Sequence, residues 1–320
     1  MAARRRGVDD SEPPRVGRFK APVMASLAVA AIAGWGVFIG AVPSSAATPA
    51  HPSSVATTPV RIAQTPTGPI GYRMVGRGSP FVLITGFSAS MDDWLPTFVD
   101  ALALHHRVVV FDNAGVGATG TVTPLNISAM ADQTSALIDS LKLGRTAVLG
   151  WSMGGMVAQA LTVLHPSQVS RLVLAATQAG TGKALPVPAA PAAAAASTNP
   201  AKVLSVLFPA SQTAAVARYV QGILKYPGYY TASPAIKAAQ TTAIQQWLAG
   251  RDPPGRRISD IRVPTLVADG TADELDPEAN DRLLARSIHD AQLVLYPEAG
   301  HGFLFQDASS FTSRVGKFLH

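Results

Sequence analysis

Short runs rich in Val, Leu and Ile alternate with segments of helical periodicity through most of the chain after residue 60. The runs lie at Phe81–Ile84, Arg107–Phe111, Thr146–Leu149, Arg171–Ala175, Thr265–Ala268 and Gln292–Tyr296. The helical patterns lie near Asp93–Leu104, Ser128–Leu141, Met153–Leu164, Glu278–Ile288 and Ser309–Phe318. Within the runs there is little polar alternation, as expected for strands that are buried on both faces of a sheet. This alternation predicts an α/β fold with a mostly parallel central sheet and flanking helices.

The regular alternation stops between residues 178 and 258. This stretch includes a low-complexity Ala/Pro segment, Pro186–Pro200, followed by helix-like patterns at Ala201–Leu207, Thr213–Leu224 and Pro234–Leu248. Because so many residues separate two predicted strands, we expect 178–258 to be a helical cap inserted into a core formed by 60–177 and 259–320. A packing elaboration without function is the alternative.

The N-terminal part of the chain has a different composition. Residues 1–20 form a basic region with six basic and three acidic side chains, and no charged residue occurs from Ala21 to Val60. Pro22–Val42 is a run of 21 residues that are nearly all apolar or small. As a helix rising about 1.5 Å per residue, this run could just cross a bilayer core. We therefore expect a signal peptide or membrane anchor at 21–42 and a linker at 43–59.

Two export routes fit this N-terminal pattern. The length of the apolar run favours an uncleaved anchor, whereas the small residues Ser44–Ala47 resemble a signal-peptidase site. Both routes predict an extracytoplasmic domain, either secreted or anchored to the cell membrane, because the basic flank is retained inside. A buried core helix is the third interpretation.

Composition excludes several classes of site. The chain has no cysteine, which excludes a disulfide framework, a thiolate metal site and a cysteine nucleophile. The formal net charge of +6 could suggest a polyanionic partner, but half of that excess lies in residues 1–20. No basic helix or RNA-binding signature occurs in the rest of the chain. We expect no nucleic-acid partner, no metal and no organic cofactor.

The most specific local motif is Gly150-Trp151-Ser152-Met153-Gly154-Gly155, which fits G-x-S-x-G between a predicted strand and a predicted helix. A strand-to-helix turn tight enough to expose a serine hydroxyl forces a strained backbone and needs minimal neighbouring side chains. The helix that follows directs its N-terminal N–H groups to the same point. We expect Ser152 to be a nucleophile; an ordinary glycine-rich turn is the alternative.

A serine nucleophile needs a general base, and the base needs an orienting acid. Asp273 and His301 follow the last two predicted strands. Because the carboxyl ends of parallel strands meet at one edge of a sheet, we expect Ser152, Asp273 and His301 to converge there as a catalytic triad. Asp269 and Asp276 are alternative candidates for the acid.

Attack of a serine on a carbonyl carbon generates an oxyanion, which needs two N–H donors. We expect one donor from Met153 and the other from the loop Thr85–Ser88, with Phe87 favoured. Trp151 and Phe87 could also line the substrate pocket. Aromatic residues of the insertion could line an apolar pocket or simply pack in the core: Phe208, Tyr219, Tyr226, Tyr229 and Tyr230.

These motifs, in this order, resemble those of the α/β-hydrolase fold family over about Arg61–Phe318, and Phe111–Gly117 resembles that family's D-x-R-G-x-G segment. The resemblance implies a serine hydrolase that cleaves carboxylic esters or related acyl bonds through an acyl-enzyme, on a small, apolar acyl substrate. It also leaves open a cofactor-free haloperoxidase or perhydrolase, a C–C bond hydrolase, and a non-catalytic binding protein of the same fold.

The chain departs from the family pattern at two positions. Thr85 stands where the family usually has histidine, and Ala114 stands where it usually has arginine. In the family these two residues usually support the loops around the pocket. The sequence therefore does not indicate which side chains support those loops in this chain. The serine at position 152 argues against the branches that use aspartate there.

Overall fold

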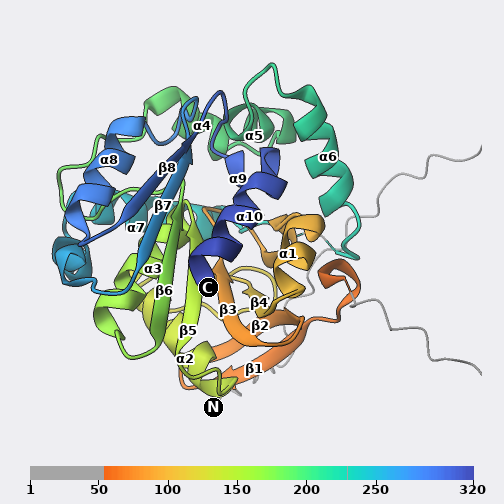
Figure 1. Cartoon of the computed structure of the whole chain (residues 1–320), viewed down its shortest axis with the longest axis vertical. Coiled ribbons are helices and arrows are strands. Elements are labelled where there is room, and N and C mark those ends of the chain that lie inside the picture. Colours follow the sequence, from red (N-terminus) through yellow and green to blue (C-terminus); the bar gives the residue numbers. More distant parts are fainter. Residues whose placement is uncertain (1–53, 229) are drawn as a thin grey trace, which may run out of the picture. The chain divides into compact units, whose positions relative to one another are not determined.

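A sheet of eight strands forms the centre of the computed structural model, which describes residues 54–228 and 230–320 (Figure 1). The strand order is β1-β2-β4-β3-β5-β6-β7-β8. The strands are β1 (Arg61–Thr65), β2 (Gly68–Val75), β3 (Ser79–Ile84), β4 (His106–Phe111), β5 (Thr146–Trp151), β6 (Val169–Ala175), β7 (Thr265–Gly270) and β8 (Gln292–Tyr296). β2 is antiparallel to β1 and β4, whereas β3 to β8 are mutually parallel. The predicted mostly parallel central sheet is confirmed.

Helices cover both faces of the sheet, and each face has its own hydrophobic core (Figure 1). One face carries α1 (Pro96–Ala103), α9 (Phe303–Gln306) and α10 (Ala308–Leu319), and the other carries α2 (Ile127–Ser140), α3 (Met153–Leu164) and α8 (Glu278–Ser287). Along β3, Phe81 and Leu83 belong to the first core, and Val82 and Ile84 belong to the second. Successive strand residues point to opposite faces. Burial of both sets therefore explains the lack of polar alternation in the sequence.

The segment between β6 and β7 is mainly helical. It contains α4 (Ala189–Ala195), α5 (Pro200–Leu207), α6 (Thr213–Ile223), α7 (Pro234–Leu248) and the 3-10 helix η3 (Pro253–Asp260). Shorter 3-10 helices lie at η1 (Val55–Thr57) and η2 (Met91–Asp93). α4 has no counterpart among the predicted helices, because an Ala/Pro run has no hydrophobic periodicity. Alanine nevertheless favours the helix, and Pro191 falls within its first turn, where proline is tolerated. The boundaries of 178–258 as a separate cap stay a prediction.

Strands β1 and β2 were not predicted from the sequence. β1 is mostly exposed, with Ile62 46% accessible, so it has no buried apolar run. β2 contains Gly68, Pro69 and Gly71, residues that are depleted in strands. These two strands form because they pair with each other and with β4 at one end of the sheet. Local strand propensity does not predict such pairing.

Within residues 54–228 and 230–320, no helix is both long enough and apolar enough to cross a membrane. On this finding the prediction of an extracytoplasmic location, by secretion or by a membrane anchor, is corrected and is not carried further. The basic region at 1–20, the apolar segment at 21–42 and the linker up to residue 53 lie outside the described residues.

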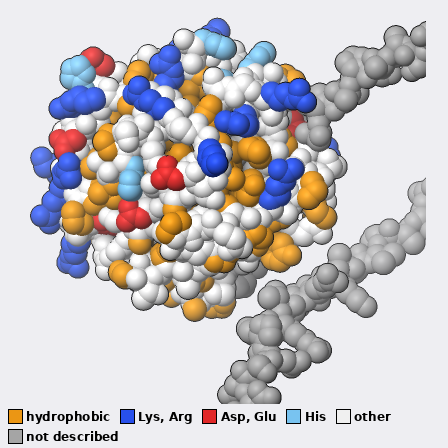
Figure 2. All heavy atoms as spheres, turned by 90° about the horizontal axis from the view of Figure 1, so that it is seen from below, with side chains coloured by type: hydrophobic (Ala, Val, Ile, Leu, Met, Phe, Trp, Pro, Cys, Tyr) orange, Lys and Arg blue, Asp and Glu red, His pale blue; other side chains and the backbone are white. Residues whose placement is uncertain are grey.

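Lys and Arg side chains are spread over the face shown in Figure 2, among hydrophobic and uncharged polar side chains. Hydrophobic side chains on this face are similarly scattered, as is normal for protein surfaces. The expectation that the chain binds no nucleic acid stays a prediction.

Candidate active site

Ser152 occupies the turn between β5 and α3 with φ 58° and ψ −126°. A positive φ is uncommon for a residue with a side chain and costs conformational energy. The Ser152 N–H donates to the Ala175 carbonyl at 2.9 Å, and the Ser152 carbonyl accepts from Thr177 Oγ1 at 2.7 Å. These two bonds hold the serine in the strained turn that the sequence motif predicts.

The glycines of the motif are required by close backbone approach. A Cβ placed on Gly150 would lie 2.3 Å from the carbonyl oxygen of Gly154, and one placed on Gly154 would lie 2.1 Å from the carbonyl oxygen of Ile84. Backbone atoms cannot move aside as a flexible side chain can. The beginning of α3 can therefore approach β3 and β5 only because both positions lack a side chain.

His301 and Asp273 form a buried pair. His301 Nδ1 lies 2.6 Å from Asp273 Oδ2, and Asp273 Oδ1 accepts the N–H groups of Leu275 at 2.7 Å and Asp276 at 3.0 Å. Of the three candidate acids, Asp273 is the one bonded to His301 among the described residues. Asp269 accepts its hydrogen bond from a neighbouring backbone N–H, and Asp276 accepts its own from an asparagine side chain.

The electrostatic surroundings of His301 favour its protonated form. Burial lowers the pKa of His301, but the negative charge of Asp273 and the hydrogen bond to it act in the opposite direction. The net pKa is raised above that of an ordinary histidine. A proton on Nδ1 facing the carboxylate leaves Nε2 as the acceptor, which is the tautomer that a general base needs.

A cavity of about 320 Å³ is lined by Ser152, His301, Phe87 and Met153. It thus joins the predicted nucleophile and base with the two residues predicted to supply oxyanion donors. Neither the Phe87 N–H nor the Met153 N–H donates to a protein oxygen in the described part of the chain. The volume lies at the lower end of the usual range for small-molecule sites.

Trp151 is not among the residues that line the cavity, so its predicted place in the substrate pocket gains no support from the structure. The indole is 5% exposed and packs against Phe305, with ring centroids 5.1 Å apart. Its Nε1 donates to the His301 carbonyl oxygen at 3.0 Å. As a strand residue next to Ser152 it points into the core, where it supports the backbone of His301.

Three of the aromatic residues considered for the pocket in the inserted segment pack in the core. Phe208, Tyr219 and Tyr226 are buried, and the hydroxyl groups of Tyr219 and Tyr226 donate to backbone carbonyls of the segment after β3. Tyr230 is half exposed, and none of these four lines the cavity. Tyr229 lies outside the described residues.

Two side chains that sequence reasoning missed support the loop that carries Phe87. Asn113 Nδ2 donates to the Thr85 carbonyl at 2.9 Å and to Thr85 Oγ1 at 3.1 Å. On the other side of the loop, Gln240 Oε1 accepts the Ser88 N–H at 2.8 Å. This chain has Thr85 and Ala114 where the family usually has histidine and arginine. Asn113 and Gln240 thus hold the loop in the absence of those two side chains.

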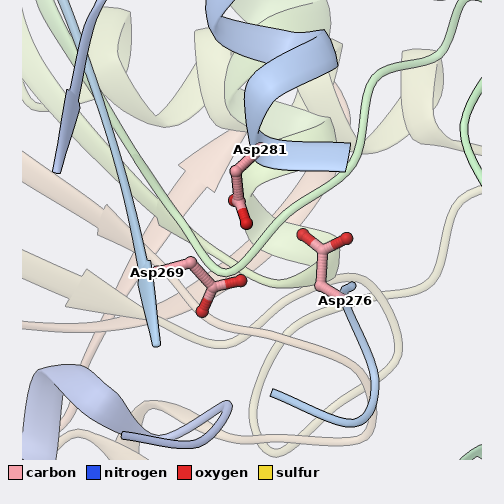
Figure 3. A group of neighbouring side chains, drawn as sticks. All are labelled: Asp269, Asp276 and Asp281. Carbon is pink, nitrogen blue, oxygen red and sulfur yellow. The ribbon is translucent and has the colours of Figure 1, made fainter. Parts of the chain in front are cut away.

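Three buried carboxyl groups, those of Asp269, Asp276 and Asp281, face one another near Asp273 (Figure 3). One oxygen from each lies within 4.8 Å of the others, a spacing that could also hold a metal ion. Burial, followed by the charge of Asp273, raises the pKa of Asp276 to about 7. Burial, followed by the charges of Asp276 and Asp273, raises the pKa of Asp281 to about 9. Without a cation, Asp281 therefore keeps its proton at neutral pH.

Comparisons with known proteins are consistent with this architecture. A family model described as alpha/beta hydrolase fold matches residues 79–308. The chain is 31% identical over 252 residues to a poly(3-hydroxyalkanoate) depolymerase from Ectopseudomonas oleovorans, a match that covers 75% of this chain and 84% of the relative. It is 28% identical over 257 residues to a 2-hydroxymuconate semialdehyde hydrolase from Pseudomonas sp. (strain CF600), covering 76% of this chain and 88% of the relative.

Among solved structures, an alpha/beta hydrolase fold protein from Chitinophaga pinensis matches with a TM-score of 0.76 and 27% identity. The match covers 83% of this chain and 99% of that one. The two sequence relatives carry names that refer to different substrates. The substrate of this chain therefore has to be argued from its own cavity.

Proposed function

The chain belongs to the α/β-hydrolase fold family, and we propose that within this family of hydrolases it is a serine hydrolase that cleaves carboxylic esters. One observation carries the proposal: Ser152, held at a strained φ, lines the same cavity as His301, whose Nδ1 lies 2.6 Å from Asp273 Oδ2. This placement supports Ser152 as nucleophile, His301 as base and Asp273 as orienting acid, the three roles that acyl transfer needs.

In the first half of the reaction, Ser152 Oγ attacks the ester carbonyl carbon while His301 Nε2 takes the hydroxyl proton. Asp273 holds the imidazole in the useful tautomer and stabilises the imidazolium that forms. The tetrahedral intermediate then expels the alcohol, which receives its proton from His301. The ester C–O bond is broken, and the acyl group is bound to Ser152.

The oxyanion of each tetrahedral intermediate would be stabilised by the N–H groups of Phe87 and Met153. Support comes from their place in the cavity lining and from their freedom from other acceptors in the described residues. Removing one donor of this kind typically costs about 2.7–4 kcal/mol of transition-state stabilisation. The positive end of α3 acts in the same direction.

Hydrolysis of the acyl-enzyme repeats the same steps with water as nucleophile. His301 takes a proton from the water as its oxygen attacks the acyl carbon, and it returns the proton to Ser152 Oγ as the acyl–oxygen bond breaks. The products are a carboxylic acid and free enzyme. Every proton in this cycle passes through His301, and no cofactor is needed.

The comparison with the depolymerase favours an ester bond, since a poly(3-hydroxyalkanoate) is a polyester. The name of the second relative favours a C–C bond hydrolase as the alternative on the same residues. Perhydrolase chemistry is a further alternative. Measuring alcohol release from esters against C–C cleavage and against peracid formation, on one enzyme preparation, separates the three reactions.

The proposal is tested by ester hydrolysis in Ser152→Ala, with Ser205→Ala as the control, because Ser205 is an exposed serine on α5. We expect Ser152→Ala to lower kcat by at least about 10⁴-fold, as loss of a triad nucleophile does elsewhere, and Ser205→Ala to leave it unchanged. Circular dichroism checks that both variants are folded. Ester hydrolysis at the wild-type rate by folded Ser152→Ala would refute the proposal.

A further inference from the structure

The cavity beside Ser152 is apolar over most of its wall. In the part of the chain that the structure describes, its lining contains no Lys and no Arg, and its ionisable side chains are His301 and Asp276. The remaining polar lining consists of Ser152 and a few uncharged side chains, such as Gln178 and Thr241. A substrate group that lies away from His301 therefore meets no cationic side chain in this space.

One wall of the cavity is made of very small side chains. Residues 184–196 contain only Ala, Leu, Pro and Val, and none of them is buried. Ala192, Ala195 and Ala196 line the cavity, and their spacing places them on one face of α4. Ala193 is exposed and lies outside the lining. On the inner face of α4, a side chain larger than alanine would therefore extend into the cavity and reduce its volume.

The lining also contains larger aliphatic and thioether side chains. Met153 and Met156 come from α3, and Ile244 and Leu248 come from α7. Methionine is flexible and polarisable, so it fits apolar groups of varying shape. Together with the alanines these side chains enclose a space that begins at Ser152 and is suited to an aliphatic chain.

We propose that this cavity holds the acyl group of the ester as an uncharged aliphatic chain of medium length, and that the inner face of α4 sets the longest chain accepted. The inference rests on the proposed function, because Ser152 defines the end of the cavity where the carbonyl carbon lies. The space of about 320 Å³ corresponds to about ten groups of water size. The acyl chains that fill it have about six to ten carbon atoms.

Acyl chains that end in a carboxylate are excluded by the same lining. A carboxylate that enters without a cationic partner loses hydration that the few uncharged donors of the lining, such as Gln245, replace only in part. The lining also contains the carboxyl group of Asp276, which would repel a substrate carboxylate when it is ionised. Methyl octanoate and monomethyl suberate differ by this terminal carboxylate, so they form a matched pair of substrates.

The first experiment measures kcat/KM for p-nitrophenyl esters of increasing acyl length with the wild-type protein. Each methylene that becomes buried should raise kcat/KM by about fourfold until the cavity is full. We expect a rise from acetate to a maximum between hexanoate and decanoate, followed by a fall. Methyl octanoate should be preferred over monomethyl suberate by at least tenfold.

The second experiment places a larger side chain on the inner face of α4. Ala195→Phe should lower the ratio of kcat/KM for decanoate to kcat/KM for acetate by at least tenfold. The matched control is Ala193→Phe, the same change on the exposed side of the helix, which should leave the whole profile within twofold. Activity on acetate reports that the variant is folded. If Ala195→Phe loses acetate activity as well, Ala195→Leu takes its place, with the same direction expected.

Failure of this inference can be distinguished from failure of the proposed function. If Ser152-dependent ester hydrolysis is found, but acetate is the best substrate, or Ala195 variants keep the wild-type profile, or suberate is preferred, the chain-length inference is overturned while the function stands. If no ester is hydrolysed through Ser152, both are overturned.

Discussion

Asp273 uses its two carboxylate oxygens for different purposes. Oδ2 faces His301, whereas Oδ1 accepts two backbone N–H groups from the turn that follows. The backbone bonds fix the orientation of the carboxylate, so that its charge acts on a single nitrogen of the imidazole. This explains why the pKa of His301 is raised although the imidazole is buried.

The first prediction concerns the pH dependence that follows from this pair. His301 must be neutral to accept the serine proton, so kcat/KM should fall as pH falls through a pKa above the ordinary value of about 6.5. Asp273→Asn removes the charge that raises this pKa, and the His301 titration should move to lower pH. NMR titration of the histidine resonances measures the shift.

Asp132→Asn is the control for this titration, because Asp132 pairs with a different histidine, His165, at the surface. It should leave the His301 titration in place. An unchanged His301 pKa in folded Asp273→Asn would contradict the role given to Asp273.

At the scale of elements, the turn between β5 and α3 was predictable because its determinants are local. Gly150, Ser152 and Gly154 lie within five consecutive residues, and both flanking elements have clear patterns. The supports of the Phe87 loop were not predictable in the same way. Asn113 bonds a residue 28 positions away, and Gln240 bonds one 152 positions away, so no local pattern marks them.

The inserted segment between β6 and β7 contacts both loops of the candidate site. Gln240 on α7 accepts the Ser88 N–H beside Phe87, and the carbonyl oxygen of Leu207 at the end of α5 accepts the Gly302 N–H beside His301 at 2.7 Å. Helices that sequence analysis predicted only as a cap thus also position the backbone on either side of the cavity. The sequence could predict these helices but not their hydrogen bonds.

The second prediction concerns Asp281 in the first turn of α8. Its pKa of about 9 in the folded protein lies above the ordinary 3.8, so between these values the folded state binds a proton that the unfolded state has lost. The free energy of unfolding should therefore decrease as pH rises, by up to about 1.4 kcal/mol per pH unit for each such proton. Asp281→Asn needs no proton and should make this decrease shallower.

Chemical denaturation at about pH 6, 7 and 8 measures this effect, because all three pH values lie within the titration window. The control is Asp290→Asn, since the Asp290 side chain is 87% exposed. The prediction is contradicted if the free energy of unfolding has the same pH dependence in the wild type and in Asp281→Asn. That result would show that Asp281 is ionised in the folded protein, or that a cation holds it.

At the scale of the whole molecule, the candidate site is a product of parallel strand order. Ser152, Asp273 and His301 follow β5, β7 and β8, which lie within one run of neighbouring strands, β5-β6-β7-β8. Because those strands are parallel, their carboxyl ends share one edge, and residues far apart in sequence meet there. This convergence was predictable from the strand pattern and the order of the motifs.

The walls of the cavity were not predictable from that order. α4 comes from an Ala/Pro run that has no periodicity, and its alanines gain their significance only because they line the same cavity as Ser152. Likewise, composition alone led to the prediction of an extracytoplasmic location, which was corrected because no helix in the described residues can span a membrane. Patterns of hydrophobicity constrain an ordered sheet more tightly than they constrain a low-complexity or terminal segment.

The most direct test of the serine hydrolase proposal is covalent labelling by a fluorophosphonate probe, followed by peptide mass mapping. We expect one label per wild-type molecule on the peptide that contains Ser152, protection from labelling by an ester substrate, and no label on folded Ser152→Ala. Undiminished labelling of Ser152→Ala, or a label on another residue of the wild type, would contradict the proposal.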